Sequence, residues 1–221
     1  MKNEESSVDK TVMHVESLAG KEHARSCKAR GMCRPLVFIF HLSLFLLIPS
    51  CTADDYEYSS HQCYLIIDNS THLDATLSSA LVQLSPGVFC RIYTPGDSYF
   101  YFESNQGLSS KSAMNAVDKQ RTMVIGVNNG SGIIVGYGTL NYPATLYAFD
   151  RQCPNCYEET GLPRYGLTMS DAGIATCSSC QRTYDMNNGG IVASGATGGD
   201  KKMFRYRVSY VESTRVLFVN N

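Results

Sequence analysis

The sequence is poor in histidine and lacks the motifs of common enzyme classes. It has five histidines among 221 residues, and none of them follows His72. Because histidine is the side chain that most often serves as a general base, this shortage removes most acid–base schemes from the larger part of the chain. Nor does the sequence offer a nucleophile elbow, a His–Asp pair or a dinucleotide-binding fingerprint. We therefore expect a protein that is not an enzyme.

An excess of charge of either sign is also lacking. The chain has 19 Lys and Arg against 20 Asp and Glu, which gives a formal net charge of −1. The basic residues form no stripe, and this argues against a nucleic-acid partner. The glycine-rich turn at 128–132 is followed by neither a helical pattern nor Gly-Lys-Ser/Thr, so we do not interpret it as a phosphate-binding loop.

No apolar run reaches the length of about 20 residues that a comfortable bilayer span needs. A shorter apolar run covers residues 35–49, and basic residues precede it. This arrangement is typical of a secretory signal peptide, which we assign to residues 32–50. Signal peptides begin close to the initiator, and Met32 stands where this one would begin. We therefore interpret residues 1–31 as an upstream extension and not as part of the fold.

The apolar run ends in the sequence Ile48-Pro49-Ser50-Cys51, where a small residue directly precedes a cysteine. This motif resembles the lipobox of bacterial lipoproteins. By that resemblance, Cys51 becomes the lipidated first residue of a mature protein held in a bacterial cell envelope. The anchor would be in the outer membrane, with the protein on its periplasmic or surface side. Ordinary cleavage near residue 53 and a short transmembrane anchor are the alternatives. The polar, acidic residues 51–62 are interpreted as a solvated tether.

Two C-x2-C pairs stand in the second half of the chain. Cys153 and Cys156 form the first pair, and Cys177 and Cys180 form the second. The spacing is typical of a zinc site. A two-residue spacer lets a tight turn direct two thiolates at one point, and two such turns supply a tetrahedral site for Zn²⁺ or for a cluster iron. Two disulfides in a metal-free binding module, or a single redox pair, are the alternatives.

Several short segments follow in a definite order around these cysteines. They are residues 146–149 before the first pair, 173–176 before the second, Tyr184-Asp185, 189–196 and 204–208. In this order they resemble the Rieske iron–sulfur domain over about residues 132–219. The resemblance implies an all-β fold, a small Rieske-like barrel or sandwich, with two zinc-ribbon-like knuckles at 153–180.

The ligand set departs from that family. Its two histidine ligands would fall near Cys156 and at Cys180, and both positions are cysteines here. Because the high potential of a Rieske centre depends on two imidazole ligands, all-thiolate ligation implies a much lower potential. We therefore favour structural zinc, since a closed four-thiolate site leaves no open position for a substrate. A 2Fe–2S cluster in an electron-transfer protein is the alternative.

The pattern of apolar residues indicates one β domain over residues 63–221. Strands are expected at 64–67, 88–93, 99–102, 123–127, 133–137, 146–149, 173–176, 191–193, 203–210 and 216–219. The fourth and fifth of these are expected to form a hairpin around Asn129-Gly130. Leucines at three- and four-residue spacing predict one amphipathic helix at 72–84. Residues 103–120 are expected to be a polar loop with one helical turn, and 157–172 a loop between the cysteine pairs.

Two further cysteines, Cys63 and Cys90, lie in this domain. In an oxidising compartment they are a candidate disulfide. The alternative is a pair of small, buried apolar thiols. The sequence does not fix their separation in space, so it leaves both interpretations open.

Overall fold

The protein is described by a computed structural model that covers residues 57–221. The signal-peptide segment, Cys51 and the first part of the tether lie outside the described residues. The described part is built mainly of β-strands, as the sequence predicts, with a few short helices. None of the helices within 57–221 has the length and apolar character needed to cross a bilayer.

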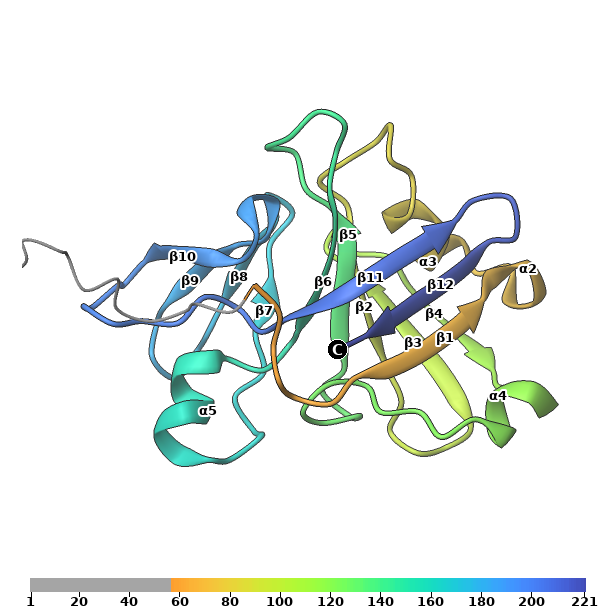
Figure 1. The fold of residues 1–221 in the computed structure, drawn as a ribbon, viewed down its shortest axis with the longest axis horizontal. Coiled ribbons are helices and arrows are strands. Elements are labelled where there is room, and N and C mark those ends of the chain that lie inside the picture. The colour runs from red at the N-terminus through yellow and green to blue at the C-terminus, as the bar shows by residue number, and fades with distance from the viewer. Residues whose placement is uncertain (1–56) are drawn as a thin grey trace, which may run out of the picture. The chain divides into compact units, whose positions relative to one another are not determined.

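Eight strands form one antiparallel sheet, which curls into a half barrel (Figure 1). Its strand order is β1-β12-β11-β6-β5-β2-β3-β4. The strands are β1 (Tyr64–Asp68), β2 (Phe89–Tyr93), β3 (Tyr99–Ser104), β4 (Ser109–Ala113), β5 (Ile133–Tyr137), β6 (Leu146–Asp150), β11 (Arg205–Val211) and β12 (Val216–Asn220). Three short helices accompany this sheet, namely α2 (Asn69–His72), α3 (Ala75–Ala80) and α4 (Ala116–Gln120).

A smaller antiparallel sheet with the order β10-β9-β8-β7 carries the second cysteine pair. Its strands are β7 (Thr168–Met169), β8 (Ile174–Thr176), β9 (Thr183–Asp185) and β10 (Ile191–Ser194). Helix α5 (Pro154–Thr160) begins at the first pair, and the 3-10 turn η1 (Met186–Asn188) follows β9. The small sheet and α5 lie together on the left of the large sheet in Figure 1.

Strands β2 and β5 are buried on both faces because they lie between two clusters of apolar side chains. In β2, Cys90 packs into the cluster enclosed by the large sheet, whereas Phe89 packs into the cluster shared with the small sheet. In β5, Val135 and Ile134 divide between the two clusters in the same way. Successive side chains of a strand point to opposite faces, so each strand reads as a continuous apolar run. The cysteine-bearing part is therefore packed directly onto the large sheet.

The predicted hairpin around Asn129-Gly130 is wrong. Residues 123–127 form no strand, and Val124 makes only an isolated bridge to Tyr64. The expected partner strand, β5, pairs instead with β2 on one side and β6 on the other. Because both edges of β5 are occupied, it has no edge to offer to residues 123–127.

The predicted helix at 72–84 is divided into two short helices. Helix α2 ends at His72, Leu73 takes a φ of 51°, and α3 begins after Asp74. The Asp74 carboxylate accepts a hydrogen bond of 2.8 Å from the N–H of Leu77. An N-cap residue has extended backbone angles, so Asp74 interrupts the helix that the leucine spacing predicts.

The segment 103–120, expected as a polar loop with one helical turn, contains the short helix α4 and also the strand β4, which was not expected. The polar composition of β4 conceals it from a search for apolar alternation, because it is an edge strand that pairs only with β3. Helix α4 starts after Asn115, whose side chain accepts from the N–H of Asp118, while Asp118 accepts from the N–H of Asn115. This reciprocal pair is a capping box and fixes the start of the helix.

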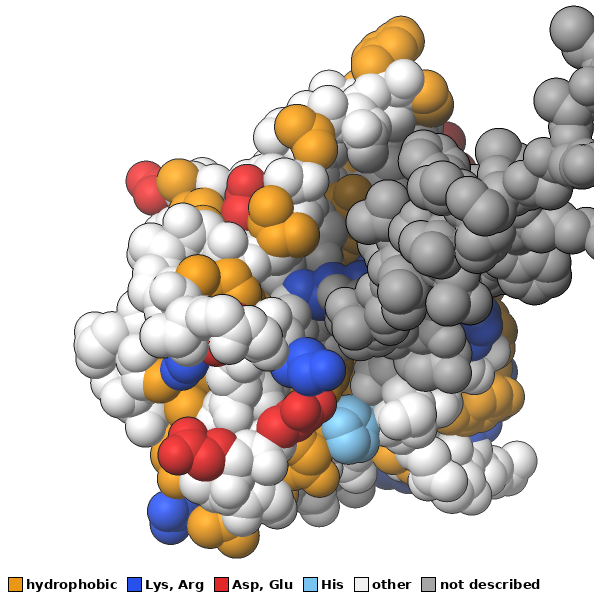
Figure 2. Space-filling model, turned by 60° about the vertical axis from the view of Figure 1, so that its left-hand side comes forward, with side chains coloured by type: hydrophobic (Ala, Val, Ile, Leu, Met, Phe, Trp, Pro, Cys, Tyr) orange, Lys and Arg blue, Asp and Glu red, His pale blue; other side chains and the backbone are white. Residues whose placement is uncertain are grey.

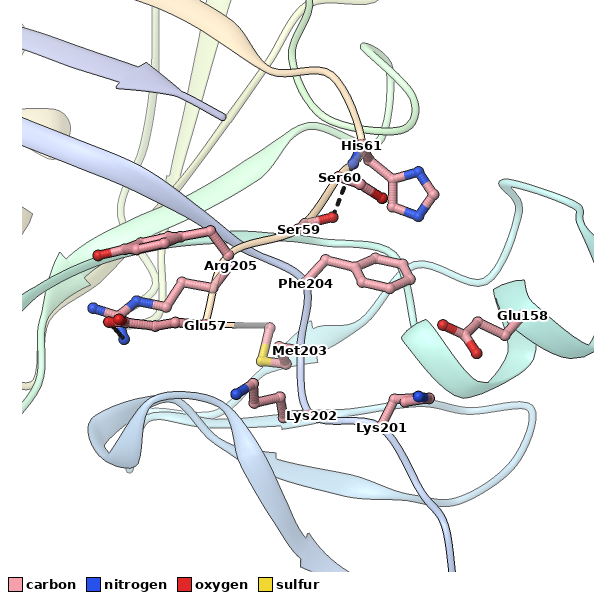
Figure 3. A pocket seen from close by; sticks show the side chains of 11 residues that line it. Glu57, Ser59, Ser60, His61, Glu158, Lys201, Lys202, Met203, Phe204 and Arg205 are labelled. Carbon is pink, nitrogen blue, oxygen red and sulfur yellow. Dashed lines mark hydrogen bonds and ion pairs between the residues drawn. The ribbon is translucent and has the colours of Figure 1, made fainter. Parts of the chain in front are cut away.

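The last residues of the predicted tether lie against the domain. The N–H of Ser59 donates to the carbonyl of Arg205 at 2.7 Å, and the His61 ring packs edge-on against Phe204 with ring centres 4.6 Å apart. Figure 2 brings this side of the molecule forward and shows acidic and basic side chains interspersed. Ser59, His61 and the neighbouring residues Phe204 and Arg205 form one wall of a pocket of about 350 Å³. Glu158 of α5 lies on the other side of this pocket (Figure 3). Its walls carry charges of both signs, so the pocket specifies no charge for a ligand.

Candidate metal centre

The first cysteine pair lies at the start of helix α5. Cys153 is the N-cap residue, Pro154 is the first helical residue, and Cys156 follows in the first turn. Proline suits this position because its fixed φ matches the helix. The N–H that proline lacks would have no acceptor within the helix at this position, so no hydrogen bond is lost. Gly161 ends the helix with a φ of 68°. The first pair is thus held by a helix, where the sequence predicted a knuckle followed by a loop.

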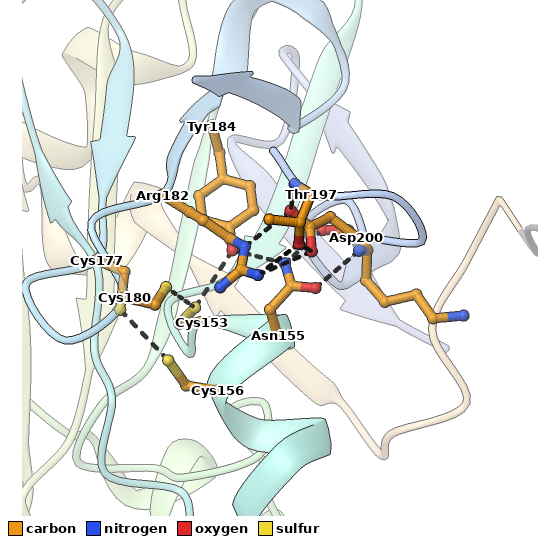
Figure 4. Close-up of polar contacts among 10 residues, drawn as sticks. Cys153, Asn155, Cys156, Cys177, Cys180, Arg182, Tyr184, Thr197 and Asp200 are labelled. Atoms are coloured by element: carbon orange, nitrogen blue, oxygen red, sulfur yellow. Dashed lines mark hydrogen bonds and ion pairs between the residues drawn. The ribbon is translucent and has the colours of Figure 1, made fainter. Parts of the chain in front are cut away.

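The second pair lies in the turn between β8 and β9. The N–H of Cys177 donates to the carbonyl of Arg182 at 3.0 Å, and the N–H of Gln181 donates to the carbonyl of Cys177 at 2.9 Å. Gln181 takes a φ of 62°, which closes the turn. This tight turn matches the local geometry expected from a two-residue spacer, and it brings Cys180 to the same side as Cys177 (Figure 4).

The structure brings the four predicted cysteines together. Their sulfur atoms all lie within 4.8 Å of one another. The sulfurs of Cys153 and Cys180 are 3.8 Å apart, and those of Cys156 and Cys177 are 3.7 Å apart (Figure 4). Cys153, Cys156 and Cys177 are buried, and Cys180 is partly exposed. The four thiols form a compact group that can hold a metal ion.

These distances fit a single tetrahedral ion. With a zinc–sulfur bond of about 2.3 Å, the sulfurs of a regular tetrahedron lie about 3.8 Å apart. The separations of Cys153 from Cys180 and of Cys156 from Cys177 match that value, and all four sulfurs lie within 4.8 Å of one another. A two-iron cluster divides its four thiolates between two irons and therefore requires the sulfurs to spread apart.

Without a bound cation, the two thiols of the first pair keep their protons at neutral pH. Burial raises the pKa of Cys153 to about 11, and burial together with the neighbouring cysteines raises the pKa of Cys156 further. A thiol in such surroundings keeps its proton unless a positive charge compensates the thiolate. A bound cation supplies that charge, because a coordinating thiol is deprotonated outright.

Tyr184 connects the site to the chain beyond it. Its hydroxyl oxygen lies 3.2 Å from the sulfur of Cys153 and accepts a hydrogen bond of 2.9 Å from the side-chain amide of Asn155. The Asn155 amide is oriented by the backbone of Lys201, which donates to its oxygen at 2.8 Å and accepts from its nitrogen at 3.0 Å. A metal-bound thiolate has no proton, so in that state the Tyr184 hydroxyl is the donor to sulfur.

Arg182 lies beside the partly exposed cysteine. Its guanidinium makes two hydrogen bonds to the Asp200 carboxylate, of 2.8 and 2.9 Å, and a third to Thr197 (Figure 4). Burial raises the pKa of the Cys180 thiol, but hydrogen bonds from Arg182 and from the neighbouring cysteines outweigh it and lower that pKa to about 7. Of the thiols with shifted pKa values, Cys180 is the one poised to ionise near neutral pH.

Cys63 and Cys90 are both free and buried in the cluster enclosed by the large sheet. The structure therefore contains them as separate apolar thiols and not as the candidate disulfide. Burial raises the pKa of Cys63 to about 12 and raises that of Cys90 further. Neither thiol has any tendency to ionise at neutral pH.

A His–Asp pair, which the sequence did not reveal, is present. The Nε2 atom of His72 lies 3.2 Å from a carboxylate oxygen of Asp118, and its Nδ1 atom lies 2.8 Å from the hydroxyl of Ser112. The His72 and Asp118 side chains are only 3% and 1% exposed, so a substrate has no route to them. We interpret the group as a structural link between α2, β4 and α4. No local signal could have found it, because its members lie far apart in the sequence.

Comparisons with protein-family models, with curated proteins and with solved structures found no match to this chain. The Rieske-like resemblance therefore stays a prediction. The compact group of four cysteines on an all-β scaffold stands on the geometry alone.

Proposed function

We propose that the protein is an exported lipoprotein, anchored through Cys51, whose Rieske-like domain holds a structural zinc ion. The ligands are Cys153, Cys156, Cys177 and Cys180. The ion fastens α5 and the β8–β9 turn to each other and so completes the packing of the small sheet onto the large one. Its role is to stabilise the fold, and no reaction is assigned to it.

The observation that carries the zinc proposal is the spacing of the four sulfurs, all within 4.8 Å of one another. Four thiolates around one zinc ion form a closed site with no position for substrate or water. Structural zinc sites contribute apparent binding free energies of roughly 10 kcal/mol or more, which becomes folding free energy. The ion would join two segments that are separated by residues 157–176 in the sequence.

The Rieske-like part of the proposal rests on the order of elements around the cysteines. Strand β6 leads to the first pair, β8 leads to the second, and β9 contains Tyr184 directly before Asp185. The lipoprotein part rests on the sequence motif that ends at Cys51. Replacement of both histidine ligands by cysteine separates this chain from high-potential Rieske electron transfer.

A 2Fe–2S electron-transfer centre is the second candidate, and two features favour it. The Tyr184 hydroxyl lies against the sulfur of Cys153, and hydrogen bonds to ligand sulfurs are one means by which proteins set the potential of such clusters. Cys180 is partly exposed, which gives a surface route for an electron. This candidate requires the sulfurs to move apart from the positions observed.

The test is elemental analysis and a visible spectrum of the full chain, purified in detergent without added metal. We expect one zinc per chain and no colour. Two irons, with absorption in the visible range, would establish the second candidate. Absence of both metals together with loss of all free thiols at the four positions would overturn both.

A matched pair of variants makes the assignment specific. Cys180→Ser removes a ligand, and we expect its zinc content to fall to well below one per chain. Cys63→Ala removes a buried thiol outside the site, and we expect it to retain zinc at the level of the unmodified protein. Equal zinc content in the two variants would show that the metal is bound elsewhere.

A further inference from the structure

Two loops meet at one end of the large sheet, away from the four cysteines. One joins α3 to β2 and the other joins β5 to β6. The side-chain amide of Gln83 in the first loop donates to the carbonyl of Ala144 in the second at 3.2 Å. At their base, the N–H of Gly87 donates to the carbonyl of Tyr137 at 2.7 Å. Figure 1 shows both loops projecting upward from the end of the sheet where β5 ends.

These loops expose large apolar side chains, which we call the apolar tip. Its members are Val82, Leu84, Leu140 and Tyr142, which are 45%, 92%, 61% and 99% exposed. Single exposed apolar residues are ordinary on protein surfaces, but a gathering of them on a projecting part is a sign of an interaction surface. Figure 2 shows hydrophobic side chains at this upper, projecting end of the molecule.

The stretches that contain these loops carry no charge. Residues 75–90 and 122–149 contain no Asp, Glu, Lys or Arg, although such residues make up 18% of the chain. The other residues of the loop ends are small or neutral polar ones, such as Ser85, Asn141 and Thr145. Charged side chains are what makes insertion into a membrane costly, and here they are missing from both loops.

We propose that the apolar tip inserts into the interfacial region of a lipid bilayer. The tip is convex, so it fits the deformable layer of lipid headgroups and upper acyl chains. Leucine side chains suit the acyl region, and tyrosine is enriched at membrane interfaces because its ring is apolar and its hydroxyl is polar. Because the tip has no basic residue, its insertion requires no anionic lipid and is insensitive to salt. The inference shares no residue with the cysteine site and is independent of the metal.

The test uses the fact that the chain contains no tryptophan. The full chain is reconstituted into phosphatidylcholine vesicles, with lipids brominated on the acyl chains as quenchers. Leu84→Trp and Tyr142→Trp each place a single reporter on the tip. Val117→Trp is the matched control. Val117 is an apolar side chain that is 54% exposed, and it lies on α4, which belongs to neither of the two tip loops. All three variants carry the same N-terminal membrane attachment, which is the lipid on Cys51 after processing or residues 35–49 before it, so binding through that attachment is equal in all three.

We expect a blue shift and at least about threefold stronger quenching for the two tip reporters than for the control. The difference should persist in 0.5 M salt, on the order of several times physiological ionic strength. Adding Leu140→Ser to Leu84→Trp should reduce the quenching. Equal quenching of tip and control, or no quenching of the tip reporters, would overturn the proposal.

Discussion

The hydroxyl oxygen of Tyr184 lies 3.2 Å from the sulfur of Cys153, and both side chains are fully buried. The pKa of Tyr184 is raised by burial and by this neighbouring sulfur, so the hydroxyl keeps its proton and can donate it. Asn155 fixes the oxygen from the other side. A chain of hydrogen bonds therefore runs from the sulfur of Cys153 through Tyr184 and Asn155 to the backbone of Lys201.

Tyr184→Phe removes the hydroxyl and keeps the ring. Groups that support metal ligands in this way typically contribute about 10- to 100-fold to metal affinity, so we expect zinc affinity to fall within that range. Competition with a chromophoric chelator measures it. Tyr147→Phe is the control, since that ring lies in the same cluster and its hydroxyl has no bond to a cysteine. An unchanged affinity in Tyr184→Phe would show that the hydroxyl does not support the site.

Cys177→Ser should sharply destabilise the domain. Loss of one thiolate opens the zinc site, and even half of the expected zinc contribution, about 5 kcal/mol, corresponds to a fall in Tm of at least about 10 °C for a domain of this size. Thermal melts with and without a strong chelator make the measurement. In the unmodified protein the chelator should lower the Tm, and in the variant it should change little. A variant that melts like the unmodified protein would contradict a structural metal.

Asp118→Asn should destabilise the link between α2, β4 and α4 by about 1–3 kcal/mol, because a buried polar group loses its partner. The carboxylate of Asp118 faces His72 and also accepts from the N–H of Asn115. Denaturant unfolding gives the free energy. Asp171→Asn, at an exposed carboxyl, is the control and should change the free energy by less than about 0.5 kcal/mol.

Stability should fall at high pH because of Cys63. Its pKa is about 12 in the folded protein, against an ordinary value of 9.0. Above pH 9 the unfolded chain releases the thiol proton and the folded chain does not, so folding loses about 1.4 kcal/mol per pH unit until pH 12. We expect Cys63→Ala to be less destabilising at pH 11 than at pH 8, by about 2–3 kcal/mol. An equal effect at both pH values would mean that the thiol is not protected.

Two glycines with nearly the same positive φ should respond differently to alanine. Gly126 has a φ of 69° and Gly161 a φ of 68°, so the intrinsic strain of an alanine, about 1 kcal/mol, is the same. At Gly126 a Cβ atom would collide with the carboxylate of Asp150, whereas at Gly161 it would meet open space. Unfolding free energies should therefore fall at least about 2 kcal/mol further for Gly126→Ala. Equal losses would show that Asp150 can move aside.

The sequence by itself determined the features that depend on neighbours along the chain. The two-residue spacing within each cysteine pair predicted a shared site, and the apolar pattern predicted a strand at 203–210, where the structure has β11. The conformation of a turn and the alternation of side chains along a strand depend only on residues that are close in the sequence. They survive any arrangement of the rest of the chain, which is why most of the strands were foreseeable.

The tertiary structure alone decided which distant segments meet. It gave both edges of β5 to β2 and β6, so the hairpin that Asn129-Gly130 predicts did not form. It brought His72 to Asp118, directed Phe89 and Cys90 into different clusters, and placed Tyr184 against Cys153. These outcomes depend on competition among segments for sheet edges and buried space. The free energy of burial is summed over the whole domain, so local sequence signals cannot decide them.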